Sequence, residues 1–278
     1  MAYKEISGNI FNTKAMAIVN TVNCVGAMGK GIALDFKLRF PEMFKEYQRI
    51  CFQHLLKPGQ ILPYTKSTPI ILNFAVKDDW KDPSKIEWVE ETLQKFVDNY
   101  KRLGISSVAF PWMGAMNGGI PIETIKILMR KYLSALEDIE IEVYDFDPDA
   151  PCALYKTLEL IVKESKFTPS ELEDISNIKA CYWVKIIDAV NDANTKSINN
   201  LCNYIVNGKR IIGKTNIERL FVIAKFRLTE RCVNLSPEGL DVEEFVTDDS
   251  NKKDGAIELT EGKEWILVEV SLLLSIKC

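Results

Sequence analysis

The chain has 278 residues, of which 47% are hydrophobic and 27% charged, with a net charge of −4. These values are typical of a globular protein long enough for two domains, and they give no sign of a dedicated, strongly basic nucleic-acid binder. No apolar run approaches the ~20 residues of a membrane helix, and the first residues lack the apolar core of a signal peptide, so we expect a cytoplasmic protein without membrane contact.

The cysteines and the histidine exclude several kinds of site. The seven cysteines are scattered and form no CxxC pair, so neither a disulfide framework nor a zinc site is expected, and we expect no metal. His54 is the single histidine and lies in a polar segment, which disfavours Ser-His-Asp and Cys-His catalysis.

The first fifty residues predict two strands, a glycine-rich loop and two helices. Residues 3–6 read as a strand, and the apolar run 15–19 as a strand buried on both faces that ends in Asn20 and Asn23. Three glycines follow before a helix over 32–40 and, after Pro41, a second over 44–52. A strand, a glycine-rich turn and a helix N-terminus offer backbone N–H groups to a phosphate. The alternative is a tight turn that needs glycine for its positive φ.

The next hundred residues continue the alternation of strands and helices. We expect a hairpin from 60–64 and 69–76, a helix over 86–100 with Pro83 at its N-terminus, and a strand over 107–110. A second glycine-rich loop spans 111–119, Pro121 opens a further helix, and 139–146 forms a last strand. This order predicts a mostly parallel sheet covered on both faces, and because both glycine loops directly follow strands, they should meet at one edge and form one site.

The composition changes at the acidic, proline-bearing segment 145–151, which we interpret as a domain boundary. Beyond it we expect helices over 154–162, 172–190, 198–206 and 217–228, a polar loop over 241–255, and strands over 257–259 and 265–274. The sequence thus predicts a domain over 1–148 and a smaller C-terminal α+β domain over 149–278, winged-helix-like in its order of elements.

Three motifs resemble the macrodomain family: NTVNCVGAMGKGIALDFK with FPEMF, ILNFAVKDDWKDPSKIEWVEETL, and VAFPWMGAMNGGI. Within that family the likeness is to the DarG-like branch, the DNA ADP-ribosyl glycohydrolase antitoxins of DarT–DarG systems, and it covers about residues 1–148. The resemblance implies a three-layer α/β/α macrodomain with a mostly parallel central sheet that binds ADP-ribose as ligand and product, without a cofactor.

By the family pattern, Asn9 and Ile10 lie near the adenine, Asn20 and Asn23 face the distal ribose, and two loops wrap the diphosphate. The first loop comprises Gly26, Ala27, Met28, Gly29, Lys30, Gly31 and Ile32, and the second comprises Gly114, Ala115, Met116, Asn117 and Gly118. Asn20 and Asn23 could instead cap the strand and the turn. Relatives carry a Gly-Cys-Gly-Asn-Gly-Gly second loop, so Met116 stands where a glycine allows close backbone approach.

The same resemblance assigns catalysis to Lys77, which follows the strand in Asn-Phe-Ala-Val-Lys. An amine whose pKa is lowered by burial can attack C1″ of the ribose, or a protonated amine can give its proton to the leaving base. The alternative is a solvated lysine paired with Asp78 or Asp79.

The resemblance therefore implies an ADP-ribosyl glycohydrolase that removes mono-ADP-ribose from thymidine in DNA and so reverses an ADP-ribosyltransferase toxin. ADP-ribosylated DNA is the expected substrate, and residues 149–278 are expected to recruit a partner, such as the cognate toxin. Two other hypotheses stay open: a non-catalytic ADP-ribose reader, and a DNA-binding regulator with a ligand-sensing macrodomain.

Overall fold

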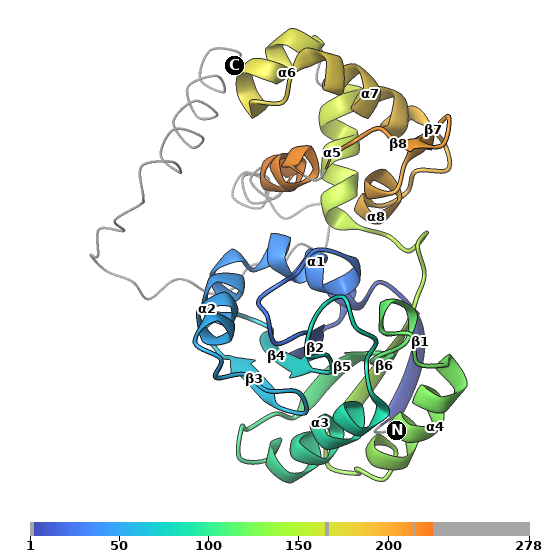
Figure 1. Ribbon diagram of the computed structural model, residues 1–278. Helices are drawn as coiled ribbons and strands as arrows, with labels where there is room; N and C mark the ends of the chain where they lie inside the picture. Colours follow the sequence, from blue (N-terminus) through green and yellow to red (C-terminus); the bar gives the residue numbers. More distant parts are fainter. Residues whose placement is uncertain (1–2, 165–166, 214, 225–278) are drawn as a thin grey trace, which may run out of the picture. The chain divides into compact units, whose positions relative to one another are not determined.

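A computed structural model of the chain describes residues 3–164, 167–213 and 215–224. The chain divides into two compact units between Asp147 and Pro148, and each unit is considered by itself (Figure 1). In the described residues, no helix combines the length and apolarity needed to cross a membrane.

A six-stranded sheet forms the centre of the N-terminal unit (Figure 1). All neighbouring strands are parallel except the last pair, which forms the antiparallel hairpin expected from the sequence. In spatial order the strands are β1 (Tyr3–Gly8), β6 (Glu140–Phe146), β5 (Ser107–Pro111), β2 (Ala17–Val22), β4 (Ile70–Ala75) and β3 (Ile61–Tyr64). The predicted mostly parallel sheet is confirmed.

Helices cover both faces of this sheet, which gives three layers. On one face Phe36 of α1 (Gly31–Arg39) and Tyr47 of α2 (Pro41–Phe52) pack against Ile18 and Ile71. On the other face, Val19 and Leu72 join the side chains of α3 (Ile86–Asn99) and α4 (Ile122–Leu133). Successive strand residues point to opposite faces, so β2 and β4 supply both cores. The short 3₁₀ helices η1 (Ile10–Asn12) and η2 (Met116–Gly118) lie in loops.

Two boundaries in this unit differ from the sequence expectation. The strand expected over 15–19 runs from Ala17 to Val22, because β4 pairs with it in parallel along its whole length. Asn20 therefore lies inside the strand, opposite Asn73, and does not end it. Pro83 was wrongly placed at a helix N-terminus, since α3 begins at Ile86 with Lys85 as its N-cap.

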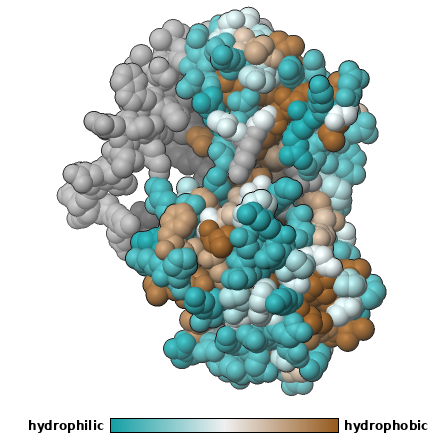
Figure 2. Space-filling model, in the orientation of Figure 1, coloured by the Kyte–Doolittle hydropathy of each residue, from teal (hydrophilic) through white to brown (hydrophobic). Residues whose placement is uncertain are grey.

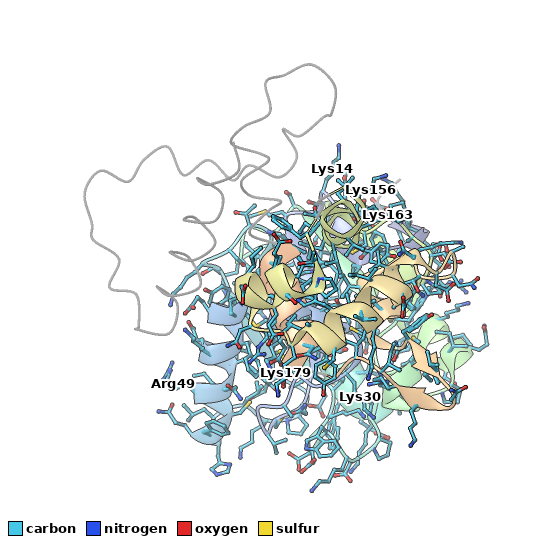
Figure 3. All side chains as sticks on the ribbon, turned by 90° about the horizontal axis from the view of Figure 1, so that it is seen from above. Lys14, Lys30, Arg49, Lys156, Lys163 and Lys179 are labelled. Carbon is cyan, nitrogen blue, oxygen red and sulfur yellow. The ribbon has the colours of Figure 1, made fainter. Side chains whose placement is uncertain are left out.

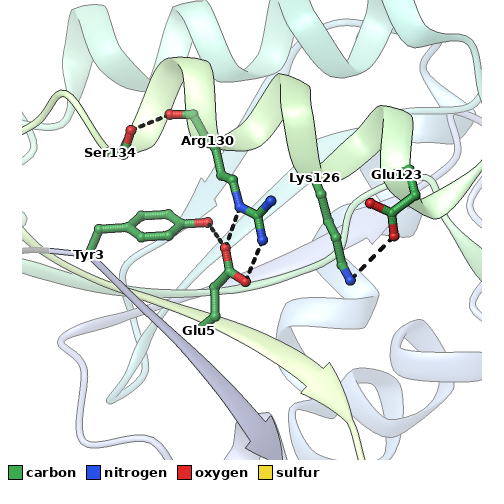
Figure 4. Close-up of polar contacts among 6 residues, drawn as sticks. All are labelled: Tyr3, Glu5, Glu123, Lys126, Arg130 and Ser134. Carbon is green, nitrogen blue, oxygen red and sulfur yellow. Dashed lines mark hydrogen bonds and ion pairs between the residues drawn. The ribbon is translucent and has the colours of Figure 1, made fainter.

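Edge strand β1 is bonded to α4 as well as to β6. The guanidinium of Arg130 donates two hydrogen bonds, of 2.7 and 2.8 Å, to the carboxylate of Glu5 (Figure 4). The hydroxyl of Tyr3 donates to the same carboxylate. The two parallel N–H···O bonds of an arginine fork fix direction as well as distance. The first strand is thereby held in register at the end of the sheet.

In the residues that the structure describes, up to residue 224, the C-terminal unit is helical with a short hairpin. Its elements are α5 (Ala153–Glu164), α6 (Pro169–Ser176), α7 (Ala180–Asn191), α8 (Ile198–Cys202), β7 (Ile205–Val206), β8 (Lys209–Arg210) and a helix over residues 215–224. The single helix expected over 172–190 is wrong: Asn177 takes a left-handed conformation and separates α6 from α7. The helix expected over 198–206 ends at Cys202, since the turn Asn207-Gly208 folds its last residues into a hairpin. The loop and strands expected over 241–274 lie outside the described residues.

Candidate functional site

Three segments leave the carboxyl ends of adjacent strands at one edge of the sheet. The first loop follows β2, the segment Lys77–Ser84 follows β4, and the second loop follows β5. Ligands of parallel α/β sheets bind at this edge. The order β5-β2-β4 places all three segments side by side, as the sequence predicted for the two loops.

The two glycine loops touch. Gly31 has a φ of +56°, and a Cβ added there would lie 2.6 Å from the amide nitrogen of Asn117. Since real Cβ atoms do not approach a heavy atom so closely, any other residue would have to displace the Asn117 side chain, and the positive φ by itself favours glycine. The closeness of Gly31 and Asn117 thus depends on the missing side chain.

The segment after β4 is bonded to both loops. The backbone N–H of Cys24, which lies between β2 and the first loop, donates to the carbonyl of Asp78 at 2.9 Å. Toward the second loop, Lys77 Nζ donates to the backbone oxygen of Asn117 at 2.7 Å. The backbone N–H of Ser84 donates to the backbone oxygen of Gly118 at 2.8 Å. The segment therefore holds the two loops in fixed relation to each other.

Lys77 is half-buried, and this burial lowers the pKa of its amine, while the charge of Asp82 opposes the shift. A lowered pKa increases the neutral fraction, which is the form that can act as a nucleophile. The amine reaches the carbonyl of Asn117 and is not paired with Asp78 or Asp79 within the described chain. The alternative of a lysine paired with a neighbouring aspartate does not describe this geometry.

Asn23 builds the first loop. Its side-chain oxygen accepts the N–H groups of Val25 and Ala27 at 3.1 and 3.2 Å, and its amide nitrogen donates to the carbonyl of Ala27 at 2.6 Å. The hydroxyl of Tyr47, from α2, lies 2.7 Å from the backbone oxygen of Asn23. The amide of Asn23 is thus engaged within the turn, and its expected contact with the ribose stays a prediction.

Asn20 belongs to a buried chain of amides beneath the first loop. Asn20 is 0% exposed, and its amide nitrogen donates to the side-chain oxygen of Asn73 at 2.8 Å and faces the sulfur of Met28 at 3.9 Å. Asn73 in turn donates to the carbonyl of Leu62 at 3.2 Å. Among the described atoms, the side-chain oxygen of Asn20 is buried without a hydrogen-bond partner. A water or a ligand hydroxyl would complete the hydrogen bonding of such an atom, but only after the residues that cover it move aside.

Two residues of this site were not singled out from the sequence. Asn73 interrupts an apolar buried strand at the position opposite Asn20, and that interruption was the available signal. Ser84 is buried beneath the second loop, where a Cβ on Gly118 would lie 2.8 Å from its hydroxyl. Nothing in the spacing of Ser84 distinguished it from other loop serines.

The second loop contains a strained residue. Met116 has a φ of +41°, in the left-handed region that favours glycine, and its side chain is 78% exposed. Gly114 and Gly119 also have positive φ, and the N–H of Ile120 donates to the carbonyl of Gly114 at 3.0 Å to close the loop. The backbone therefore keeps the glycine-type conformation although a methionine occupies it. Ala115 is buried beneath.

The N-terminus of α1 is suited to an anion. Lys30 is its exposed N-cap (Figure 3) and makes no side-chain cap, and the first turn holds no acidic residue. The first N–H groups of a helix without a side-chain cap attract phosphates, helped by the helix dipole. Ile32 of the same turn packs against the α1–α2 core. Gly26 and Gly29 precede this turn, and Gly26 has a φ of +80°.

Asn9 and Ile10 lie at the same edge, after β1. The side-chain oxygen of Asn9 accepts the N–H of Phe11 at 3.1 Å, and Ile10 is buried. Phe11 packs edge-on against Phe36 of α1, with ring centroids 4.9 Å apart. In the sheet order, β6 and β5 separate β1 from β2, so these residues lie apart from Lys77 along the edge.

Cys24 and Trp112 are packed in or against the hydrophobic cores, whereas Trp80 is not. Burial raises the pKa of the Cys24 thiol to about 12, so the thiolate is scarce near neutral pH. Trp112 packs against the α3–α4 core, whereas Trp80 is exposed. In the described part of the chain, no three side chains of His, Cys, Asp or Glu are grouped as metal ligands.

Comparison with known proteins places this unit in a family. The Macro domain family model matches residues 19–129. The chain is 39% identical over 145 residues to a DNA ADP-ribosyl glycohydrolase of Thermus aquaticus, and 36% identical over 142 residues to one of Mycobacterium tuberculosis. It is 30% identical over 158 residues to a DNA ADP-ribosyl transferase–DNA ADP-ribosyl glycohydrolase fusion protein of Thermosipho africanus. Each match covers 50% of this chain and 40% of the relative, so the chain matches less than half the length of these relatives.

Solved structures show the same likeness. The macrodomain of Thermus aquaticus DarG superposes with a TM-score of 0.49 at 39% identity, covering 51% of this chain and 97% of that one. The Thermosipho africanus DarTG complex with ADP-ribose has a TM-score of 0.48 at 31% identity, covering 52% and 41%. The family model and the sequence identity of 36–39% over about half of this chain show that the N-terminal unit is a DarG-like macrodomain.

Proposed function

We propose that this protein is a DNA ADP-ribosyl glycohydrolase that removes mono-ADP-ribose from a modified base and so reverses an ADP-ribosyltransferase toxin. The observation that carries the proposal is the hydrogen bond between Lys77 and Asn117, at the point where both glycine loops meet. The names of the similar proteins support the substrate class, and the transferase–glycohydrolase fusion supports the toxin context.

In this proposal the N-terminus of α1 and the second loop bind the diphosphate. The side-chain oxygen of Asn20 accepts a hydrogen bond from a hydroxyl of the distal ribose. The neutral amine of Lys77 attacks C1″, the bond from C1″ to the base nitrogen breaks, and the base leaves with a proton while the amine loses one. Water then replaces the amine at C1″, which releases ADP-ribose and restores Lys77. The lowered pKa of Lys77 supports this role.

The test is release of ADP-ribose from an ADP-ribosylated single-stranded oligonucleotide and, in parallel, from an ADP-ribosylated protein. We expect release from DNA by the wild-type protein, and a loss of about 10²-fold or more in Lys77→Ala and Lys77→Arg. Arginine keeps the charge but is not deprotonated, so it separates a nucleophile from a simple cation. Full activity of Lys77→Ala would end the catalytic assignment, and binding without release would favour the non-catalytic reader.

A further inference from the structure

The C-terminal unit contains a helix–turn–helix. α6 ends at Ser176, Asn177 takes the left-handed conformation with φ of 54°, and α7 begins at Ala180. The DNA-binding helix–turn–helix uses a connection of this length, and its second helix enters the major groove.

Hydrogen bonds fix this turn. The hydroxyl of Ser176 accepts the indole N–H of Trp183 at 2.8 Å and the backbone N–H of Ile178 at 3.1 Å. Glu173 accepts the first N–H of α7, from Ala180, at 2.7 Å. Arg219, from the helix over residues 215–224, donates to the carbonyl of Asn177. The direction of α7 relative to α6 is therefore set by specific bonds as well as by packing.

The two faces of α7 differ sharply. Trp183 and Ile186 are fully buried, together with Ile178 of the turn and Leu172 of α6. The outer face exposes Cys181, Tyr182, Val184, Lys185 and Asp188, and Lys179 is exposed just before it. In α7, which is described throughout, Asp188 is the only acidic residue and lies in the later half. The cations thus lie in the first half, the part of a recognition helix that contacts base edges.

A short hairpin follows α7 and α8. Asn207 and Gly208 both have positive φ, as in a two-residue hairpin turn, and the strand residues Ile205, Val206, Lys209 and Arg210 are all exposed. The hydroxyl of Tyr204, next to β7, donates to Asp192, next to α7, at 3.1 Å. The base of the hairpin is therefore attached to the C-terminal end of α7, and its outer strand presents two adjacent cations.

We propose that α7 and the β7–β8 hairpin form a surface that binds duplex DNA, with α7 in the major groove and Lys209 on a neighbouring phosphate; Arg210, the next residue of β8, points to the other face and donates to Asn203 at 3.0 Å. Charge complementarity favours this partner, because Lys179, Lys185, Lys209 and Arg210 are exposed on these two elements. A helix reads a groove, which a single strand lacks, so duplex is favoured over single-stranded DNA. The inference goes beyond the glycohydrolase: it gives the chain a means of staying on DNA between reactions.

The test uses the full chain and a fluorescent random-sequence duplex of about 20 base pairs, two turns of B-DNA, with a single strand of the same length as comparison. Binding is measured by anisotropy across a salt series. We expect duplex binding that weakens steeply with salt, and a double variant Lys179→Ala/Lys185→Ala that binds about tenfold or more weakly. For Lys209→Ala, the slope of log affinity against log salt should fall in magnitude by about 0.9, the value for one phosphate contact, whereas Arg210→Ala should leave the slope unchanged.

The matched control is Lys156→Ala/Lys163→Ala, which removes two exposed lysines of α5 from the same unit; Figure 3 labels both near α5 and Lys179 apart from them. It should bind like the wild type. Absence of duplex binding at low salt, or equal weakening by the control, overturns the proposal. The proposal is also overturned if the wild type does not bind duplex DNA but binds the cognate toxin, and Lys179→Ala/Lys185→Ala loses that toxin binding. This result would assign the outer face of α7 to a protein partner. Glycohydrolase activity on a single-stranded oligonucleotide should be unchanged in these variants, so this result is independent of the assignment of Lys77.

Discussion

The amine of Lys77 donates a 2.7 Å hydrogen bond to the backbone carbonyl of Asn117. This bond joins the segment after β4 to the second glycine loop, and Asn117 in turn borders Gly31 of the first loop. The residue assigned to chemistry therefore also touches the loops assigned to the diphosphate. A change in either loop should therefore alter the position of the Lys77 amine.

The first prediction concerns pH. Burial lowers the pKa of Lys77, so in the folded protein the amine loses its proton at a lower pH than an ordinary lysine. A nucleophilic amine is inactive when protonated, so the single-turnover rate should rise with pH and level off below the usual lysine value of about 10.4. Rates measured from about pH 6 to 10 check this. A rate that falls over this range would instead indicate that protonated Lys77 gives its proton to the leaving base.

The second prediction concerns Gly31. Gly31→Ala adds a Cβ at 2.6 Å from the side-chain amide nitrogen of Asn117 and requires an unfavourable φ, so the Asn117 side chain should be displaced and the backbone of the first loop should shift. We expect ADP-ribose affinity, measured by calorimetry, to fall about tenfold or more, or by about 1.4 kcal/mol. Gly104→Ala is the matched control, since Gly104 also has positive φ but no atom lies within 4 Å of the added Cβ. It should lose about 1 kcal/mol of stability and bind normally. Equal loss of binding in both variants would contradict a contact between the loops.

The third prediction concerns Met116. Its left-handed backbone costs about 1 kcal/mol relative to glycine, while glycine loses more entropy on folding. Met116→Gly should therefore change stability little, and Met116→Ala, which keeps the strain but avoids the entropy loss of glycine, should also stay within about 0.5 kcal/mol of the wild type. Urea unfolding measures both. If the exposed side chain narrows the phosphate site, both variants should bind ADP-ribose more tightly; if the backbone matters, only the glycine variant should.

Helix α4 exposes apolar residues that the sequence pattern did not identify as surface residues. Ile122 and Ile127 are exposed, and Figure 2 shows hydrophobic residues at the surface over this helix. Helical spacing predicts a face but not its limits, because the limits depend on where the sheet ends.

The sequence predicted the layers and the shared edge because buried strands and amphipathic helices carry periodic signals. It did not show that Asn20 lies within β2, since asparagine in a strand interior is tolerated here only through its bond to Asn73. It also could not show that Gly31 meets Asn117, residues 86 positions apart in the chain, because this contact exists only once β2 and β5 are paired. The helix break at Asn177 was hidden by apolar residues on both sides of it.

The last prediction concerns the buried amides. Asn73→Leu removes the acceptor of Asn20 and leaves a fully buried amide nitrogen without its partner. Such a group costs about 1–3 kcal/mol, which urea unfolding should show as a lower midpoint with an unchanged slope. Asn99→Ala is the control, because Asn99 is only half-buried and its side chain bonds the carbonyl of Lys95 and the guanidinium of Arg102 in exposed positions; its stability should stay within about 0.5 kcal/mol of wild type. Because Asn20 also carries the free oxygen proposed to receive the ribose, Asn73→Leu should weaken ADP-ribose binding, while Asn99→Ala should not. If Asn73→Leu is less stable but binds ADP-ribose normally, the Asn20–Asn73 pair has a structural role and does not contribute to ligand binding.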